Sequence, residues 1–152
     1  MQLLLLLALV VLGLMCGSEL NIALFAHPTL NRQPLETHTL VRSSFARLLG
    51  RVMPFWGAGS TVLNLLAVLP IQPMPKPAWQ LAVTALGLQV FVVVFSLIAP
   101  VPINSRIAKW TPASLPADWQ AQEHRWDLYH WFRTGVLIVA FVLLSLSLAF
   151  AS

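Results

Sequence analysis

Charged side chains are scarce in this chain of 152 residues. They make up 9% of the sequence, whereas hydrophobic residues make up 58%. A soluble domain carries about 25% charged residues, so the composition excludes an ordinary soluble protein and indicates a membrane protein. The length allows only one domain, which we place over residues 1–152.

Several other features are missing, and their absence excludes an internal disulfide, a nucleic-acid-binding segment and a cleaved signal peptide. The single cysteine, Cys16, cannot form an internal disulfide. There is no run of basic residues and no glycine-rich phosphate loop, so the net charge of +4 does not indicate nucleic-acid binding and we expect no nucleic-acid partner. The first leucine run has no preceding Lys or Arg and no clear cleavage site after it. We therefore interpret it as a retained helix rather than a signal peptide.

The long apolar segments predict an all-α fold. We expect helices over residues 2–26, 36–69, 78–99 and 118–150, since a helix of about 20 apolar residues crosses the bilayer. Short connections between these helices predict an antiparallel, up-down, four-helix transmembrane bundle.

Prolines set the expected boundaries of these helices. His27-Pro28 should end the first helix, because the residue before a proline disfavours the helical conformation. Pro54 should kink the second helix, and the four prolines of residues 70–77 should form an extended connection. Residues 103–117 should form a loop or a short interfacial helix.

Cations are distributed unevenly between the two ends of this bundle. Lys76 alone falls at one end, and the other end holds Arg32, Arg42, Arg47, Arg51, Arg106, Lys109, Arg125 and Arg133. Cytoplasmic loops carry an excess of Lys and Arg. We therefore predict an integral membrane protein, in the inner membrane if the source is a bacterium, with the cation-rich end cytoplasmic and both termini non-cytoplasmic.

The candidates for chemistry gather at the cation-rich end. Glu19 lies one to two turns inside the first helix, where a carboxylate is costly unless it faces protein or water. On the last helix, His130 and Arg133 lie one turn apart, so one partner can reach both. We predict that these three residues converge in a cavity that Trp126 lines and the Ile103-Asn104 loop opens.

Structural roles compete with this hypothesis. A purely structural ion pair of Glu19 with Arg133 or Arg125 would explain the cluster, and we expect His38 to be solvated. Aromatic and cationic side chains are also common anchors at the membrane interface. We favour anchoring or solvation for Trp119, Tyr129, Trp131, His124, Arg42 and Arg47.

Two further polar sets lead to separate predictions. Mixed nitrogen and oxygen ligands suit iron, copper or zinc, and a metal site stays open with the candidates His27, His124, His130, Glu19 and Glu123. Their spacing matches no metal-binding motif. Asn64 and Gln89 are the strong amide side chains in the middle of the second and third helices, and we expect them to hydrogen-bond across helices.

Several motifs together resemble a known family. The motifs are Gly17-x-Glu19, His27-Pro28-x-Leu30, Pro102-Ile-Asn104, Ile107-Ala-Lys-Trp110, Asp118-Trp119 and Arg125-Trp126-Asp127-x-x-His130-x-x-Arg133-Thr134. This set, spread over nearly the whole chain, is similar to the anthrone oxygenase-like integral membrane family, also called domain of unknown function 1772.

The resemblance implies a four-helix membrane fold and, for some members, oxidation of an anthrone to an anthraquinone by O2 without an added cofactor. On this hypothesis His130 is the base, Glu19 and Arg133 complete the catalytic group, and the partners are membrane lipid and a lipophilic small molecule. Substrate-binding residues would be Trp126, Asn104, Trp119 and His27. The alternative is a non-enzymatic membrane protein that binds a small ligand or a metal, or that serves as a partner subunit. Cofactor, substrate and oligomeric state stay open.

Overall fold

The computed structural model describes residues 2–69 and 74–151, and within them helices alternate only with short connections. The first helical stretch consists of α1 (Gln2–Asn21), a π-helical segment η1 (Ile22–Ala26) and α2 (His27–Leu30). The remaining helices are α3 (Leu35–Val68), α4 (Lys76–Ile98), α5 (Pro100–Ile107) and α6 (Trp119–Phe150). The all-α prediction is confirmed.

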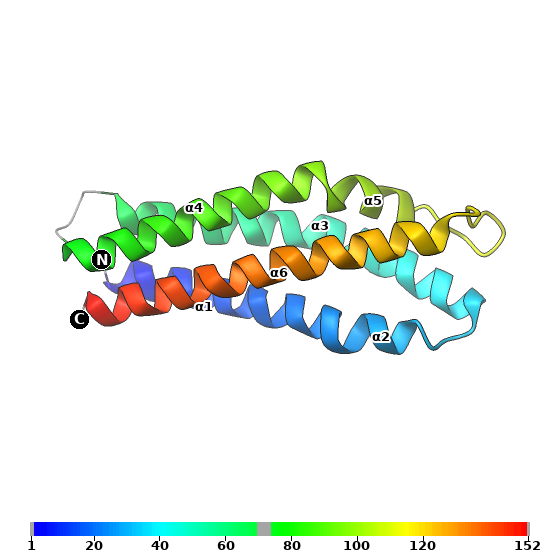
Figure 1. Cartoon of the computed structure of the whole chain (residues 1–152), viewed down its shortest axis with the longest axis horizontal. Helices are drawn as coiled ribbons and strands as arrows, with labels where there is room; N and C mark the ends of the chain where they lie inside the picture. The colour runs from blue at the N-terminus through cyan, green and yellow to red at the C-terminus, as the bar shows by residue number, and fades with distance from the viewer. Residues whose placement is uncertain (1, 70–73, 152) are drawn as a thin grey trace.

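The long helices lie side by side along one axis (Figure 1). Helix α4 packs on α6 and α3, and α1 packs on α3 and α6. Successive long helices run in opposite directions, so both ends of the chain lie at the same end of the molecule (Figure 1).

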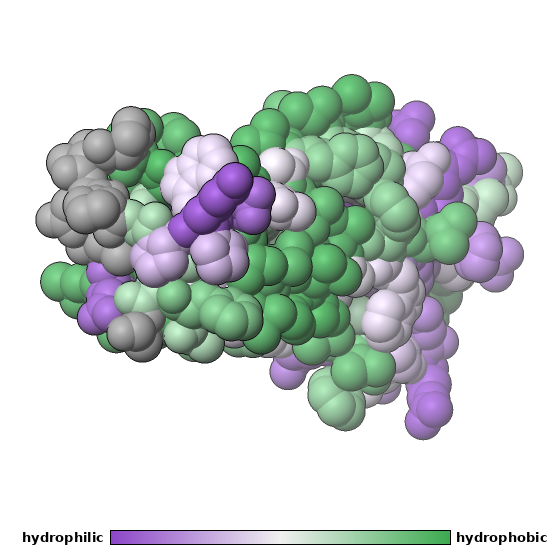
Figure 2. All heavy atoms as spheres, turned by 60° about the vertical axis from the view of Figure 1, so that its left-hand side comes forward, coloured by the Kyte–Doolittle hydropathy of each residue, from purple (hydrophilic) through white to green (hydrophobic). Residues whose placement is uncertain are grey.

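Three helical stretches of the described residues are long and apolar enough to cross a membrane: Gln2–Leu30, Lys76–Ile98 and Trp119–Phe150. Helix α3 is not one of them: its first half carries three arginines, and its 17 uncharged residues 52–68 include Ser60, Thr61 and Asn64, which lower the mean hydropathy. Apolar side chains cover the middle of the molecule, whereas hydrophilic side chains gather at the end that holds the α1–α3 and α5–α6 connections (Figure 2).

Small residues bring α4 and α6 together. Ala78, Ala82 and Ala85 recur on one face of α4 and are fully buried, as is Ala140 of α6. Small side chains allow membrane helices to approach closely, where dispersion contacts hold them. Ser147 of α6 donates a hydrogen bond of 2.8 Å to the carbonyl of Ala78.

The prediction that Asn64 and Gln89 hydrogen-bond across helices is confirmed. Asn64 of α3 and Gln89 of α4 are both buried, and Asn64 Nδ2 donates to Gln89 Oε1 at 3.5 Å. The same nitrogen approaches the carbonyl of Ala82 at 3.4 Å.

The prediction that His27-Pro28 ends the first helix is wrong, since the helix continues to Leu30. The reason lies in η1, where the His27 amide bonds to the carbonyl of Ile22, five residues back. A π-helical segment widens the turn, and this gives room for the proline ring that an α-helical turn lacks.

Other boundaries also differ from the prediction. Asn104 lies on helix α5 rather than on a loop, and α5 begins at Pro100, because the first turn of a helix needs no backbone donor from proline. Helix α4 begins at Lys76, inside the predicted extended connection, and residues 70–73 of that connection lie outside the described residues. Pro54 lies inside the single helix α3.

Candidate functional site

Three ionisable side chains meet between α1 and α6: the buried Glu19 and His130, and the partly buried Arg133. Arg133 donates hydrogen bonds from one terminal nitrogen to both carboxylate oxygens of Glu19, at 2.7 and 2.8 Å. His130 Nδ1 lies 3.0 Å from Glu19 Oε2. Glu19 is 0% exposed and His130 1%, so the predicted convergence of these three residues is present in the structure.

The imidazole of His130 is bound to Glu19 at both ring nitrogens. Nε2 donates to the backbone carbonyl of Glu19 at 3.1 Å, because a carbonyl oxygen only accepts. Nδ1 faces the carboxylate oxygen Oε2 at 3.0 Å and Arg133 Nη2 at 3.4 Å. Glu19, His130 and Arg133 therefore form one hydrogen-bonded group inside the protein.

Trp126 joins this group to α3. Its ring stacks on His130, with centroids 4.8 Å apart and an angle of 12° between the planes. The guanidinium of Arg42 lies 4.9 Å from the Trp126 ring centroid. A cation over an indole face is attracted by the ring quadrupole, so Trp126 is fixed between two basic side chains.

A second buried network continues toward the cation-rich end. Asp127 Oδ1 accepts hydrogen bonds from His27 Nδ1 and from Arg42, each at 3.0 Å. Glu123 Oε1 lies 2.8 Å from His38 Nε2 and 3.5 Å from Arg42 Nε. The two carboxylates of α6 thus bind side chains of α2 and α3: His27 from α2, and His38 and Arg42 from α3.

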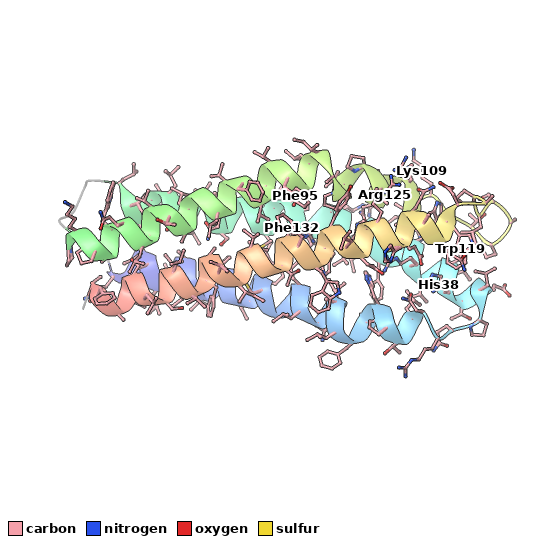
Figure 3. The ribbon with its side chains drawn as sticks, viewed as in Figure 1. His38, Phe95, Lys109, Trp119, Arg125 and Phe132 are labelled. Atoms are coloured by element: carbon pink, nitrogen blue, oxygen red, sulfur yellow. The ribbon has the colours of Figure 1, made fainter. Side chains whose placement is uncertain are left out.

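His38 and Arg42 correct two predictions. Both were expected to be solvated or to anchor the protein at the interface, yet Arg42 is 3% exposed and His38 is buried. The carboxylates of α6 explain this, because each of the two buried side chains finds an acidic partner there. Figure 3 shows His38 and Trp119 together near the cation-rich end, and their rings lie 5.5 Å apart.

An apolar cleft with a cavity volume of about 130 Å³ lies on the other side of Trp126. Its walls come from α1, η1, α3, α4, α5 and α6, and Arg133, Asn104 and Trp126 line its polar end. Asn104 is held in place by a hydrogen bond of 2.8 Å from its Nδ2 to the carbonyl of Ala46. The exposed side chains that line the cleft are apolar and mark its mouth: Pro54, Val93, Leu97 and Val101.

The predicted substrate-binding residues divide between two regions. Trp126 and Asn104 line the apolar cleft, as does Arg133. His27 and Trp119 do not, since His27 belongs to the network around Asp127 and Trp119 packs against His38. His130 also lies outside the cleft lining, behind Arg133 and Trp126.

The five metal candidates do not form one group. His124 is exposed, Glu19 and His130 pair with each other beside Arg133, His27 pairs with Asp127, and Glu123 pairs with His38 and Arg42. No group of three or more potential metal ligands gathers anywhere in residues 2–69 and 74–151.

The network of Asp127, Arg42 and His38 was missed as a site. One signal for it was present in the sequence: His38 and Arg42 are four residues apart on α3, and Glu123 and Asp127 are four residues apart on α6. Residues with this spacing lie on one face of a helix. A basic pair on one helix and an acidic pair on another predict that these two helix faces pack against each other.

A family model described as anthrone oxygenase matches residues 42–143, about two-thirds of the chain. The matched segment includes Arg42, Asn104, Trp126, His130 and Arg133, whereas Glu19 and His27 precede it. No curated protein and no solved structure matches the chain.

Proposed function

The chain belongs to the anthrone oxygenase family, and from that premise we propose that it catalyses O2-dependent oxidation of a lipophilic aromatic ketone of the anthrone type. The reaction takes place in the apolar cleft. The observation that carries this proposal is the lining of the cleft, where Arg133 alone is charged and lies directly against the Glu19–His130 pair. An apolar cavity with few polar groups at one end suits a flat, hydrophobic ligand with one polar atom.

The chemistry needs an acidic carbon and a stabilised oxyanion. The methylene between the two rings of an anthrone loses a proton, and its electron pair moves to the ketone oxygen, giving an electron-rich enolate. Arg133 and the second N–H of Asn104 bind that oxygen, and Trp126, whose ring is held between His130 and Arg42, forms part of the wall beside the substrate rings. The Glu19–His130 pair accepts the proton through one bridging water beside Arg133.

The reaction then balances with O2 alone. The enolate carbon bonds to O2, and the resulting peroxide takes up a proton. Loss of water with the second methylene hydrogen leaves a carbonyl group. One oxygen atom enters the quinone and the other leaves as water.

The bilayer supplies the substrate in this proposal. The mouth of the cleft lies between Pro54 on α3 and Val93, Leu97 and Val101 on α4 and α5. These side chains are exposed and apolar, so the mouth suits the hydrocarbon region rather than water. A lipophilic ketone dissolved in the membrane enters sideways.

This arrangement requires α3 to serve as a fourth membrane helix. Its 17 uncharged residues 52–68 span about 26 Å at 1.5 Å per residue, slightly less than the hydrocarbon core of about 30 Å. The arginines of its first half then lie in the headgroup region. The cation-rich end is cytoplasmic and both termini are non-cytoplasmic.

The test uses purified protein in detergent micelles with anthrone as substrate. Oxygen uptake and quinone absorbance should rise together, one O2 per quinone, above the rate without protein. His130→Ala should abolish the enzymatic rate while the protein still elutes as a folded species. Arg133→Lys keeps the charge but loses the planar fork, and should lower the rate about 100-fold, as loss of one oxyanion donor does.

Metal analysis of the same sample settles the cofactor. Iron, copper or zinc in a 1:1 ratio would assign a metal to the reaction, and turnover by metal-free protein would assign the chemistry to the side chains. Binding of anthrone without any oxygen uptake would contradict the enzyme and favour a ligand-binding protein.

A further inference from the structure

A small polar cavity lies beside His130, apart from the apolar cleft. Its volume is about 90 Å³, and its polar lining residues are His27, Asn31, Asp127 and His130. A water molecule occupies about 10–15 Å³ on this measure and needs two to four polar partners. The cavity therefore has the space and the hydrogen-bonding groups for several waters.

A larger cavity of about 420 Å³ continues from it toward the cation-rich end. Its lining is mostly polar and includes His38 and Glu123. Asp127 and Asn31 line both cavities, so they form the boundary between them. The side chain of Asp127 is 30% exposed, which places this boundary within reach of bulk water.

We propose that His27 and Asp127 are proton-relay residues that connect the outer cavity with the buried Glu19–His130 pair. The rings of His27 and His130 are 6.1 Å apart between centroids and line the same small cavity, where a water bound to His27 can take and return the Nε2 proton of His130, which otherwise bonds to the carbonyl of Glu19. His27 bonds to Asp127 through Nδ1, and no described residue bonds to its Nε2, which is left for that water. Each transfer along this route breaks one N–H or O–H bond and forms another.

The charged groups around His130 define the route. Glu19 faces it from α1, His27 from α2 and Arg133 from α6, and Arg42 of α3 is separated from it by the Trp126 ring. Toward the end that holds the termini, Lys76 is the one charged side chain of the described residues. The relay is thus open at one end of the molecule and does not cross the membrane.

The relay complements the apolar cleft. A substrate that fills the cleft displaces water from it, so protons need another way to and from Glu19 and His130. The inferred route uses a separate cavity, which shares no described lining residue with the cleft. This role in turnover rests on the proposed function, but proton exchange along the route does not require turnover.

The test is solvent exchange at His130 in the full-length protein. The chain has four histidines, so protein labelled with ¹⁵N-histidine in detergent micelles gives few imidazole signals. His27→Phe keeps a ring against Trp126 but removes both nitrogens. Asp127→Asn keeps the acceptor oxygen but removes the carboxylate. Each should slow exchange of the His130 ring N–H protons at least tenfold.

Asp118→Asn is the matched control, because Asp118 is an exposed aspartate beside the start of α6. In this variant the His130 ring N–H protons should exchange at the same rate as in the unchanged protein. Unchanged exchange in both His27→Phe and Asp127→Asn would overturn the relay. Slowed exchange in a protein that never oxidises anthrone would leave the relay standing and remove the proposed function. Anthrone oxidation with normal exchange in both variants would leave the proposed function standing and overturn the relay.

Discussion

At the scale of single residues, Glu19 is the strongest constraint in the molecule. A carboxylate with no exposed surface is held by two hydrogen bonds from Arg133 and by His130. Removing one partner of a buried ion pair leaves the other charge without compensation, which costs about 3–5 kcal/mol. The same geometry that supports proton exchange therefore also supports the fold.

Glu19→Ala should consequently destabilise the protein by about 3–5 kcal/mol. The measurement is unfolding in mixed detergent micelles. Glu36→Ala is the control, since Glu36 is an exposed glutamate in the first turn of α3 and its loss should change the free energy of unfolding by less than about 1 kcal/mol. Equal effects of the two substitutions would show that the Glu19 contacts contribute no stability.

The amides in the middle of the bundle have a smaller effect. Asn64→Ala removes the contact with Gln89. It should lower the free energy of unfolding by about 0.6–2 kcal/mol, the contribution of an interhelical hydrogen bond in a membrane. Thr84→Ala, an exposed polar residue on α4 that bonds only to its own helix, should leave the midpoint of the same detergent titration in place. If Asn64→Ala lowers the free energy of unfolding no more than Thr84→Ala does, the amide pair does not stabilise the bundle.

The sequence allowed the central cluster to be predicted but not its surroundings. Glu19 was identified by its depth in an apolar helix, and His130 and Arg133 by their spacing of one turn. His38 and Arg42 were misjudged because a first-turn histidine and an interfacial arginine are usually solvated, and burial depends on the partner that faces them. That partner stripe, Glu123 and Asp127, lies 85 residues away along the chain.

At the scale of elements, the π-helical segment η1 decides where His27 lies. Proline normally ends a helix or kinks it, and the sequence therefore predicted a loop after His27. The wider turn of Ile22–Ala26 keeps the helix continuous to Leu30. His27 is thereby brought to Asp127 and Trp126, a placement that proline patterns alone do not reveal.

Helix α5 is placed against α3 by a close contact at a glycine. A methyl group on Gly50 would lie 3.0 Å from the Asn104 amide nitrogen, which bonds to the carbonyl of Ala46. Gly50→Ala should therefore push Asn104 aside and lower the melting temperature. Gly59→Ala has open space around the new methyl group and should not lower it. A melting temperature unchanged by Gly50→Ala would contradict this packing.

At the scale of the whole molecule, the number of long helices and their order followed from hydrophobic runs and proline clusters. The sequence predicted that all four cross the membrane, whereas three helical stretches of the described residues are long and apolar enough to do so, and α3, half amphipathic and half apolar, is not among them. The charge asymmetry is carried through into the structure. Lys109 and Arg125 lie near the same end (Figure 3), whereas Lys76 begins α4 at the other.

Cysteine labelling tests this orientation in intact cells. A cysteine at position 76 should react with a membrane-impermeant reagent from outside, and one at position 109 should react only after the membrane is permeabilised. The native Cys16 is buried in the core and is protected from the reagent. Labelling of position 109 from outside would reverse the proposed topology and place the relay on the outer surface.

The central claim is that a lipophilic substrate is oxidised inside the apolar cleft, and two glycines of α3 test it. Gly57 lines the cleft, with Met15 as the nearest side chain to an added methyl group, whereas Gly59 is exposed and has open space around it. Gly57→Leu fills the cavity and leaves Glu19, His130 and Arg133 in place. Gly59→Leu adds the same side chain outside it.

The decisive measurement is the initial rate of anthrone-dependent oxygen uptake by these two variants and the unchanged protein. We expect Gly57→Leu to lose at least nine-tenths of the rate, an order-of-magnitude effect of excluding substrate from a pocket, and Gly59→Leu to retain it. Equal rates for both variants would contradict the claim, because a reaction in this cleft cannot proceed unaffected when the cleft is filled.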